Sequence, residues 1–220
     1  MSDPSFDLVQ FDKQPVLGII RGAPPDSAHG VMQACISAEL QYLEFTLNSK
    51  EALSCIEEGA REFPETLCVG AGTVLSVADA ERAVNAGAKF IVAPTLNEDV
   101  AAYCRERNLP YFPGALTPTE IEKAWNCGAT MVKVFPANQM GPEYFSTIRG
   151  PFNEVRLMAV GGVGPNNVHS YLGAGAAAVA LGGSIFSPER MKNKEFDIIQ
   201  KEISTFLYAV KTFYTRIDES

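Results

Sequence analysis

Two ionisable residues interrupt apolar segments of the sequence and could supply nucleophilic or acid–base chemistry. Lys133 lies within Met-Val-Lys-Val-Phe-Pro, and Glu44 lies within Tyr-Leu-Glu-Phe-Thr-Leu. Burial disfavours the charged form of an amine, which lowers its pKa and makes it available as a nucleophile. A carboxyl group in an apolar setting is either paired with a cation or has a raised pKa suited to proton transfer. The structural alternatives are an ion pair or a strand-end position for Lys133, and an ion-pair partner role for Glu44.

A third charged residue, Arg21, ends another apolar segment. Taken alone, Arg21 is a candidate for a salt bridge at the end of a strand. Taken with Lys133 and Glu44, it gives two cations and one anion on three separate apolar segments. Convergence of such groups on one end of a fold is typical of a functional site.

The apolar segments recur along the chain and start at intervals of about 20 to 26 residues. Each is nearly continuously apolar, as expected for parallel strands that are covered on both faces. The eight segments are Val16–Arg21, Tyr42–Leu47, Cys68–Val74, Phe90–Thr95, Tyr111–Leu116, Met131–Ala137, Arg156–Val163 and Ala178–Phe186.

Helical stretches are predicted between these segments. Entry signals such as Thr117-Pro118-Thr119-Glu120 and Asn48-Ser49 follow most of them, and glycines such as Gly87, Gly128 and Gly175 mark helix ends. Repetition of this βα unit predicts an α/β protein, a (β/α)₈ TIM barrel forming a single domain over residues 1–220. A doubly wound open sheet is the alternative. Residues 1–15 are predicted to add a short helix, and residues 195–216 a long terminal one.

Composition excludes several classes of function. The net charge of -8 argues against a nucleic-acid partner, which requires a basic face. No apolar run approaches the roughly 18 residues that cross a bilayer, and Met1–Ser5 does not resemble a signal peptide. The five cysteines are expected to be reduced and buried in a cytoplasmic protein. The two histidines, His29 and His169, are too few for a histidine-based metal site.

Glycine-rich segments follow the last two predicted strands. Val160–Gly164 and Leu181–Ser184 let backbone N–H groups approach an anion closely. The loops after strands 7 and 8 are the usual phosphate position in such barrels, so these segments predict a phosphate or similar anion. Gly70–Thr73, at the end of the third segment, offers a second cradle with a hydroxyl group. Close packing at a strand end is the structural alternative there.

The order of these segments resembles one enzyme family. Leu43–Leu47, Gly70–Val74, Val132–Pro136, Gly161–Val163 and Gly182–Ser184 are similar to motifs of the 2-keto-3-deoxy-6-phosphogluconate (KDPG) and 4-hydroxy-2-oxoglutarate (KHG) aldolases. The match runs from about Gln14 to Phe186 and includes Ala93-Pro94, Pro113-Gly114 and Gly150-Pro151-Phe152.

The resemblance implies a class I aldolase that needs no cofactor or metal. Such enzymes cleave a 2-keto-3-deoxy sugar acid to pyruvate and an aldehyde, work in carbohydrate metabolism such as the Entner–Doudoroff route, and are usually homotrimers. Lys133 matches the Schiff-base lysine and Glu44 the general acid/base. Phe135 could stack over the planar imine, with core packing as the alternative. The remaining matches are Arg21, Gly72, Thr73 and Pro94 for substrate binding, and Gly161, Gly162, Gly183 and Ser184 for phosphate binding.

Two positions depart from the phosphogluconate pattern. Asn48 stands where those family members often carry an arginine, and Val160 stands where they often carry a threonine. Both changes resemble the phosphogalactonate branch of the family. The imine chemistry is unaffected, but the preferred aldehyde and the configuration at C4 stay open.

Two rival functions are compatible with part of the pattern. Another phosphate-binding barrel, such as a sugar-phosphate isomerase, would share the glycine loops without needing Lys133 in an apolar strand. A non-catalytic barrel that binds a sugar acid would need neither the lysine nor Glu44. The presence of both residues favours the aldolase.

Overall fold

The computed structural model of the chain describes residues 6–218, with side chains through residue 216, and this part forms nine parallel strands. The strand order is β5-β4-β3-β2-β1-β9-β8-β7-β6, and β5 and β6 are consecutive in the chain, so the sheet curls into a nearly closed barrel. The predicted (β/α)₈ barrel is confirmed, and the open-sheet alternative is wrong. The strands are β1 Val16–Ile20, β2 Tyr42–Thr46, β3 Cys68–Gly72, β4 Ile91–Val92, β5 Tyr111–Phe112, β6 Gly114–Ala115, β7 Val132–Val134, β8 Leu157–Ala159 and β9 Ala178–Leu181.

The fifth apolar segment differs from the prediction, because it forms two short strands around Pro113. Proline has no backbone N–H, so it cannot donate to a neighbouring strand. β5 pairs with β4 before the proline, and β6 pairs with β7 after it. The Pro113 carbonyl still accepts a hydrogen bond from the Lys133 N–H at 2.9 Å. The interruption therefore occurs where the barrel closes onto the strand that carries Lys133.

The interior of the barrel is filled by alternate residues of the strands. Side chains of a strand point to opposite faces in turn, so one set faces the barrel axis and the other faces the surrounding helices. The fully buried interior cluster comprises Phe11, Leu17, Tyr42, Phe90, Val92, Phe112, Met131, Met158, Val160, Ala178 and Ala180. Glu44 and Lys133 each lie two residues beyond a member of this cluster and therefore point inward as well.

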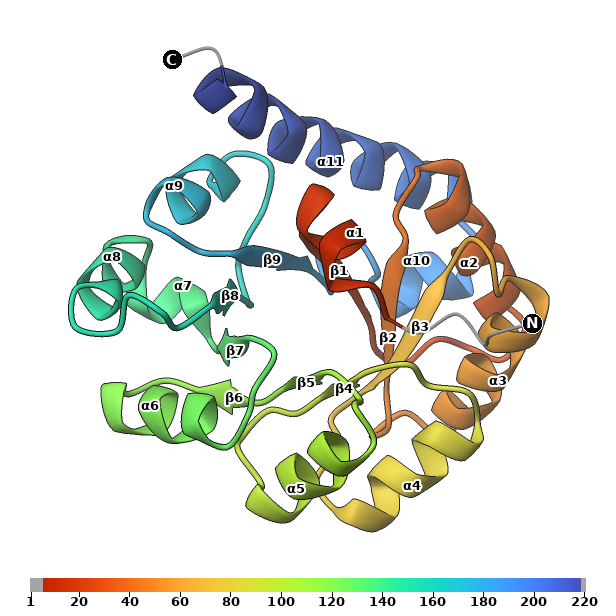
Figure 1. Cartoon of the computed structure of the whole chain (residues 1–220). Coiled ribbons are helices and arrows are strands. Elements are labelled where there is room, and N and C mark those ends of the chain that lie inside the picture. Colours follow the sequence, from red (N-terminus) through yellow and green to blue (C-terminus); the bar gives the residue numbers. More distant parts are fainter. Residues whose placement is uncertain (1–5, 219–220) are drawn as a thin grey trace.

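The helices surround the barrel, except the first, which lies over its middle (Figure 1). They are α1 Leu8–Lys13, α2 Ala28–Ser37, α3 Ala52–Glu62, α4 Val77–Asn85, α5 Glu98–Glu106, α6 Pro118–Asn126, α7 Ala137–Met140, α8 Glu143–Arg149, α9 Val168–Gly173, α10 Pro188–Lys192 and α11 Phe196–Asp218. The entry signal at Thr117 forms a capping box with Glu120. Gly87, Gly128 and Gly175 follow helix ends with φ of 101°, 93° and 97°, as predicted for left-handed terminating residues.

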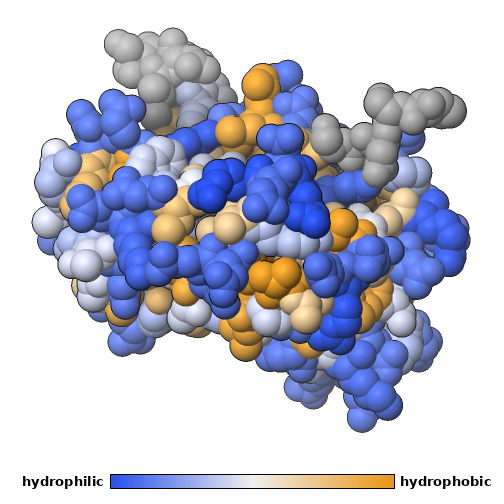
Figure 2. Space-filling view, turned by 60° about the horizontal axis from the view of Figure 1, so that its bottom comes forward, coloured by the Kyte–Doolittle hydropathy of each residue, from blue (hydrophilic) through white to orange (hydrophobic). Residues whose placement is uncertain are grey.

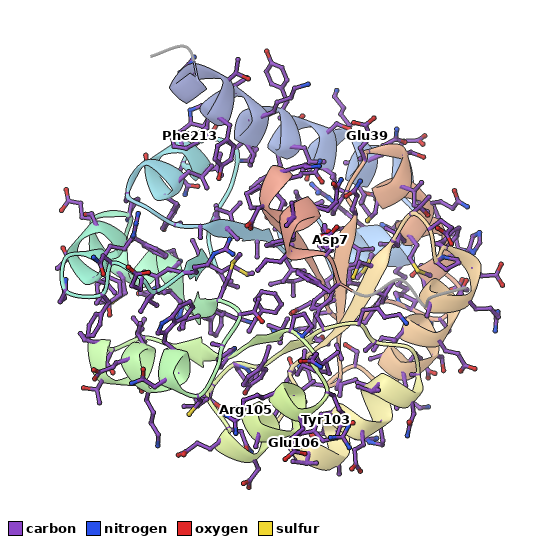
Figure 3. All side chains as sticks on the ribbon, viewed as in Figure 1. Asp7, Glu39, Tyr103, Arg105, Glu106 and Phe213 are labelled. Carbon is purple, nitrogen blue, oxygen red and sulfur yellow. The ribbon has the colours of Figure 1, made fainter. Side chains whose placement is uncertain are left out.

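The short helix α1 covers the amino-terminal end of the barrel. Asp7 caps it by accepting hydrogen bonds from two backbone N–H groups, and Figure 3 shows Asp7 over the middle of the ring. The Phe11 ring is fully buried, with its centroid 4.8 Å from that of Tyr42, and the Tyr42 hydroxyl donates to the Asp7 carbonyl at 3.1 Å. This aromatic plug closes one end, so the cavity of the barrel opens at the opposite end.

The surface is mostly polar on the face that Figure 2 shows, and the five cysteines, which all lie within the described residues, form no disulfides. The face shown in Figure 2 is largely hydrophilic, with small apolar patches between charged side chains. No helix within residues 6–218 combines the length and apolar character needed to cross a membrane. All five cysteines are free; Cys35, Cys55 and Cys104 are buried as predicted, but Cys68 and Cys127 are partly exposed.

Candidate active site

A cavity of about 310 Å³ opens at the carboxyl ends of the strands, where active sites of such barrels lie. It brings together seven of the predicted site residues: Arg21, Lys133, Phe135, Gly161, Gly162, Gly183 and Ser184. Apolar side chains from Ile19, Val160, Ala180 and Phe186 line the rest of its wall together with other loop residues. The cavity therefore joins a lysine, an arginine and both glycine loops.

Lys133 lies on β7 between β6 and β8, opposite Gly114 and Met158 in the strand register. Its exposed fraction is only 7%, and its Nζ lies 5.4 Å from the centroid of the Phe135 ring. Burial lowers the pKa of Lys133 below its ordinary value, and Arg21 lowers it further, whereas Glu44 acts in the opposite direction. A lowered pKa increases the neutral fraction of an amine, which is the form that can act as a nucleophile.

Glu44 lies on β2, within the interior of the same barrel. Its exposed fraction is 1%, and its Oε2 atom is buried without a hydrogen-bond partner among the described residues. Burial raises the pKa of Glu44, and the charges of Lys133 and Arg21 oppose this increase. A carboxyl group with a raised pKa and an unused oxygen is suited to exchanging a proton with a bound molecule.

Glu44 and Lys133 interact electrostatically but do not form a salt bridge. Each shifts the pKa of the other, but no ion pair within 4.0 Å joins them in the described structure. Desolvation is the largest cause of the pKa shift of each group and favours the neutral form of both. The two groups therefore interact through their charges without the direct contact that the ion-pair alternative would require.

Gly72 makes room for the Glu44 carboxyl group at the end of β3. A Cβ atom placed on Gly72 would lie 2.5 Å from Glu44 Oε1 and 2.7 Å from its Cδ. Thr73 follows with a φ of 56°, a left-handed conformation that is unusual for a β-branched residue and that turns the chain sharply out of the strand. Gly72 was predicted to bind substrate, and its geometry points first to a role in seating Glu44.

The two glycine loops present backbone N–H groups that no protein acceptor uses. Gly161 and Gly162 have φ of 100° and 73°, so the chain there adopts a form that glycine tolerates best. Hydrogen bonds within the described residues leave out the N–H groups of Gly161, Gly162, Val163, Gly183 and Ser184. Unused N–H donors clustered around one cavity are the groups that an anion would require there.

Pro94 lies apart from this cavity. It lines a neighbouring cavity of about 720 Å³ that shares Phe135 with the first. The Pro94 carbonyl packs against Gly114, where a Cβ atom would lie only 2.0 Å from the oxygen. Phe135 is 40% exposed, which argues against the core-packing alternative and places its ring between the two cavities.

Two loop-holding side chains were not identified from the sequence. The Ser49 Oγ accepts a hydrogen bond at 2.7 Å from the N–H of Gly22, the residue after Arg21, and lies 3.3 Å from Thr46 Oγ1. Asn167 accepts from the Gly164 N–H at 2.8 Å and donates to the Gly162 carbonyl at 2.9 Å.

Asn48-Ser49 was predicted to be a helix entry signal, but Ser49 does not cap the helix that follows. The residue at the start of α3 is Glu51, and it makes no side-chain capping hydrogen bond. Residues 6–216 contain no cluster of three or more His, Cys, Asp or Glu side chains arranged to hold a metal ion. The cavity wall thus offers an amine, a guanidinium group and backbone amides. Glu44 is not part of this wall; its buried carboxyl group interacts with the charges of Lys133 and Arg21.

Comparisons of the sequence with known proteins agree on one family. The family model described as KDPG and KHG aldolase matches residues 9–202. A probable 2-dehydro-3-deoxy-6-phosphogalactonate aldolase of Rhizobium meliloti (strain 1021) is 32% identical over 194 residues, covering 88% of this chain and 90% of that protein. A KHG/KDPG aldolase of Escherichia coli (strain K12) is 32% identical over 189 residues, covering 85% and 88%.

Solved structures give the same result. The native KDPGal structure has a TM-score of 0.88 at 26% identity and covers 96% of this chain and 100% of that chain. KDPG aldolase from Legionella pneumophila, with pyruvate captured at low pH as a covalent carbinolamine intermediate, has a TM-score of 0.83 at 26% identity, covering 89% and 95%. A cube-shaped protein cage designed by fusing symmetric oligomeric domains has a TM-score of 0.88 at 26% identity, covering 94% and 76%.

We predict that Gly72→Ala preserves the fold but displaces the Glu44 carboxyl group. The new Cβ atom would lie 2.5 Å from the end of the Glu44 side chain and 3.1 Å from Thr46 Cγ2, so the carboxyl group must shift. Aldolase turnover on the sugar acids named for these relatives should fall about 10- to 100-fold, as for a misplaced acid/base.

The matched control is Gly173→Ala in α9, where an added Cβ atom would make an ordinary contact at 3.7 Å with Phe213. Both variants should melt within a few degrees of the wild type, as measured by circular dichroism. Wild-type turnover in the Gly72 variant would contradict the assigned role.

Proposed function

Because this chain belongs to the KDPG and KHG aldolase family, it is an aldolase, and we propose that it cleaves a 2-keto-3-deoxy-6-phospho sugar acid through a Schiff base on Lys133. The single observation that carries this proposal is the position of Lys133. Lys133 is only 7% exposed, its pKa is lowered, and it borders the cavity that both glycine loops line. The phosphate of the sugar acid would occupy the cradle of unused N–H groups, and its keto carbon would face the amine.

The reaction begins with the neutral amine of Lys133, which attacks the C2 ketone of the substrate. Loss of water gives an iminium ion, a cation that withdraws electrons from C3. Because the iminium itself accepts the electron pair of the bond that breaks, the cleavage needs no cofactor. Arg21 supplies positive charge at the cavity wall, which suits a substrate with an acidic group.

Glu44 supplies the proton transfers in this proposal. Its carboxylate takes the proton of the C4 hydroxyl, directly or through a water molecule, as the C3–C4 bond breaks. An aldehyde leaves, and the electron pair remains as an enamine of pyruvate. Glu44 then returns a proton to C3, and hydrolysis of the iminium releases pyruvate. The raised pKa of Glu44 suits both halves of this cycle, because the group must accept a proton and later give it back.

The substrate preference is proposed to be that of the phosphogalactonate branch. Val160 lines the cavity, so an apolar wall stands where phosphogluconate members often carry a threonine. The R. meliloti relative with a phosphogalactonate name supports this choice. A lactate-dehydrogenase-coupled pyruvate assay should give a higher kcat/KM for the galactonate phosphate than for the gluconate phosphate or 4-hydroxy-2-oxoglutarate. The reverse order would contradict the preference and leave the aldolase reaction intact.

The assembly and location follow the family expectation. We propose a homotrimer in the cytoplasm, as the family resemblance implies, and the similar cage built from symmetric oligomeric domains supports an oligomer. The five free thiols fit a reducing compartment. Light scattering coupled to gel filtration tests this, since a mass matching the 23.8 kDa chain alone would contradict the trimer.

We predict that borohydride in the presence of pyruvate adds a covalent mass at Lys133 and abolishes activity. Reduction of the imine fixes pyruvate on the amine, and peptide mass spectrometry locates the adduct. Lys123→Arg, which changes an exposed lysine paired with Glu98, should retain the adduct, whereas Lys133→Arg should lose it. Glu44→Gln should still form the imine while turnover falls at least about 100-fold. A treated protein that stays active and unmodified would favour a sugar-phosphate isomerase instead.

We predict opposite pH shifts of imine formation for two variants. The charge of Glu44 raises the pKa of Lys133, so Glu44→Gln should lower that pKa and move the onset of trapping to lower pH. The charge of Arg21 lowers the pKa of Lys133, so Arg21→Met should move the onset to higher pH. The measurement is the rate of cyanoborohydride trapping against pH at saturating pyruvate. Shifts of the same sign would show that these charges do not control the amine.

A further inference from the structure

One side chain outside the cavity forms hydrogen bonds to the backbone of the second glycine loop, Leu181–Ser184, and of the residue that follows it. Arg190, on the short helix α10, donates from Nη1 to the Ser184 carbonyl at 3.0 Å and to the Ile185 carbonyl at 3.4 Å. The same nitrogen donates to Glu202 Oε2 on α11 at 2.5 Å. Arg190 does not line the cavity, so its contacts reach the site only through the loop backbone.

These contacts determine which peptide groups of the loop remain available. The N–H groups of Ile185 and Phe186 both donate to the Gly182 carbonyl at 2.9 Å. Arg190 occupies the carbonyls of Ser184 and Ile185. The groups without a partner among the described residues include the N–H donors of Gly183 and Ser184, and both residues line the cavity. A carbonyl oxygen turned toward a bound anion would repel it, whereas an N–H group attracts it.

The charge of Arg190 is already neutralised by its partner. Glu202 lies within ion-pair distance, and α11 is anchored through the buried side chains of Ile199, Ile203 and Phe206. A guanidinium group held in this way connects the loop carbonyls to Glu202, and its charge is not left free to bind the substrate. The rigid part of this clamp is therefore the long terminal helix.

We propose that Arg190, fixed by Glu202, is a positioning residue that holds the Gly183–Ser184 amides in the orientation that binds the substrate phosphate. This inference rests on the proposed function and deepens it by naming what orders one side of the anion cradle. Asn167 holds the other glycine loop through its own backbone groups, so each loop has a dedicated clamp.

The test compares Arg190→Met with Lys192→Met, which removes the same charge from an exposed residue of the same helix. Three quantities are measured: the KM and kcat for the phosphorylated sugar acid, the Kd of inorganic phosphate by ³¹P NMR titration, and the pyruvate concentration that half-saturates borohydride trapping. Pyruvate has no phosphate, so trapping reports the lysine end of the site alone. Melting curves establish that each variant is folded.

Arg190→Met should raise the KM for the sugar acid and the Kd of phosphate about tenfold, the size expected for losing a well-aligned hydrogen bond to an anion. The kcat and the half-saturating pyruvate concentration should change less than about twofold, and Lys192→Met should match the wild type. Arg190→Lys keeps a donor and should recover part of the loss. Glu202→Gln should weaken phosphate binding about two- to threefold. This variant replaces Arg190→Met in the test if Arg190→Met does not fold.

Three results would overturn the inference. They are equal phosphate affinities in the Arg190 and Lys192 variants, an equal loss of phosphate binding and pyruvate trapping, and a wild-type protein that binds no phosphate. If the wild type cleaves none of the sugar acids, the proposed function fails, and the phosphate titration alone decides the role of Arg190. A wild type that cleaves the substrate with an unchanged KM in Arg190→Met rejects only the clamp.

Discussion

The central physical constraint on this structure is the desolvation free energy of two ionisable groups, which lie inside a barrel that is otherwise apolar. Lys133 and Glu44 both point inward, and desolvation is the largest cause of the pKa shift of each. Burial favours the neutral amine and the neutral carboxyl group, while their mutual attraction favours the charged pair. Desolvation outweighs the opposing charge interactions at both groups, so the pKa of Lys133 is lowered and that of Glu44 is raised.

Glycines on the strands create the space in which these groups sit. Gly70 and Gly72 lie two residues apart on β3, so both face the barrel interior. An added Cβ atom on Gly70 would lie 2.5 Å from the Phe90 ring, and one on Gly72 would lie 2.5 Å from Glu44. Gly70 therefore makes room for the Phe90 ring of the interior cluster, and Gly72 makes room for the Glu44 carboxyl group. The same strand supports both the core and the chemistry.

Much of this arrangement is local and was predicted from the sequence. The apolar segments gave the strands, and an inward lysine or glutamate follows from the two-residue period once the strand is placed. The break at Pro113 was not predicted, because the apolar pattern of the segment does not show that proline lacks a backbone N–H donor. Ser49 and Arg190 were missed because their partners are distant or belong to the backbone. Ser49 binds Gly22, which is 27 residues away, and no composition pattern marks such a contact.

The distribution of these contacts separates the two tasks of the site. The amine and the acid stand on β7 and β2, where strand hydrogen bonds and the packed interior fix them. The anion donors stand on loops, which lack such support and depend on side chains from the surrounding helices. Under the proposed function, a change in a helix would alter how the phosphate is held without moving Lys133. Under the same proposal, residues that contact only the loop backbone would influence substrate binding in this protein from outside the cavity wall.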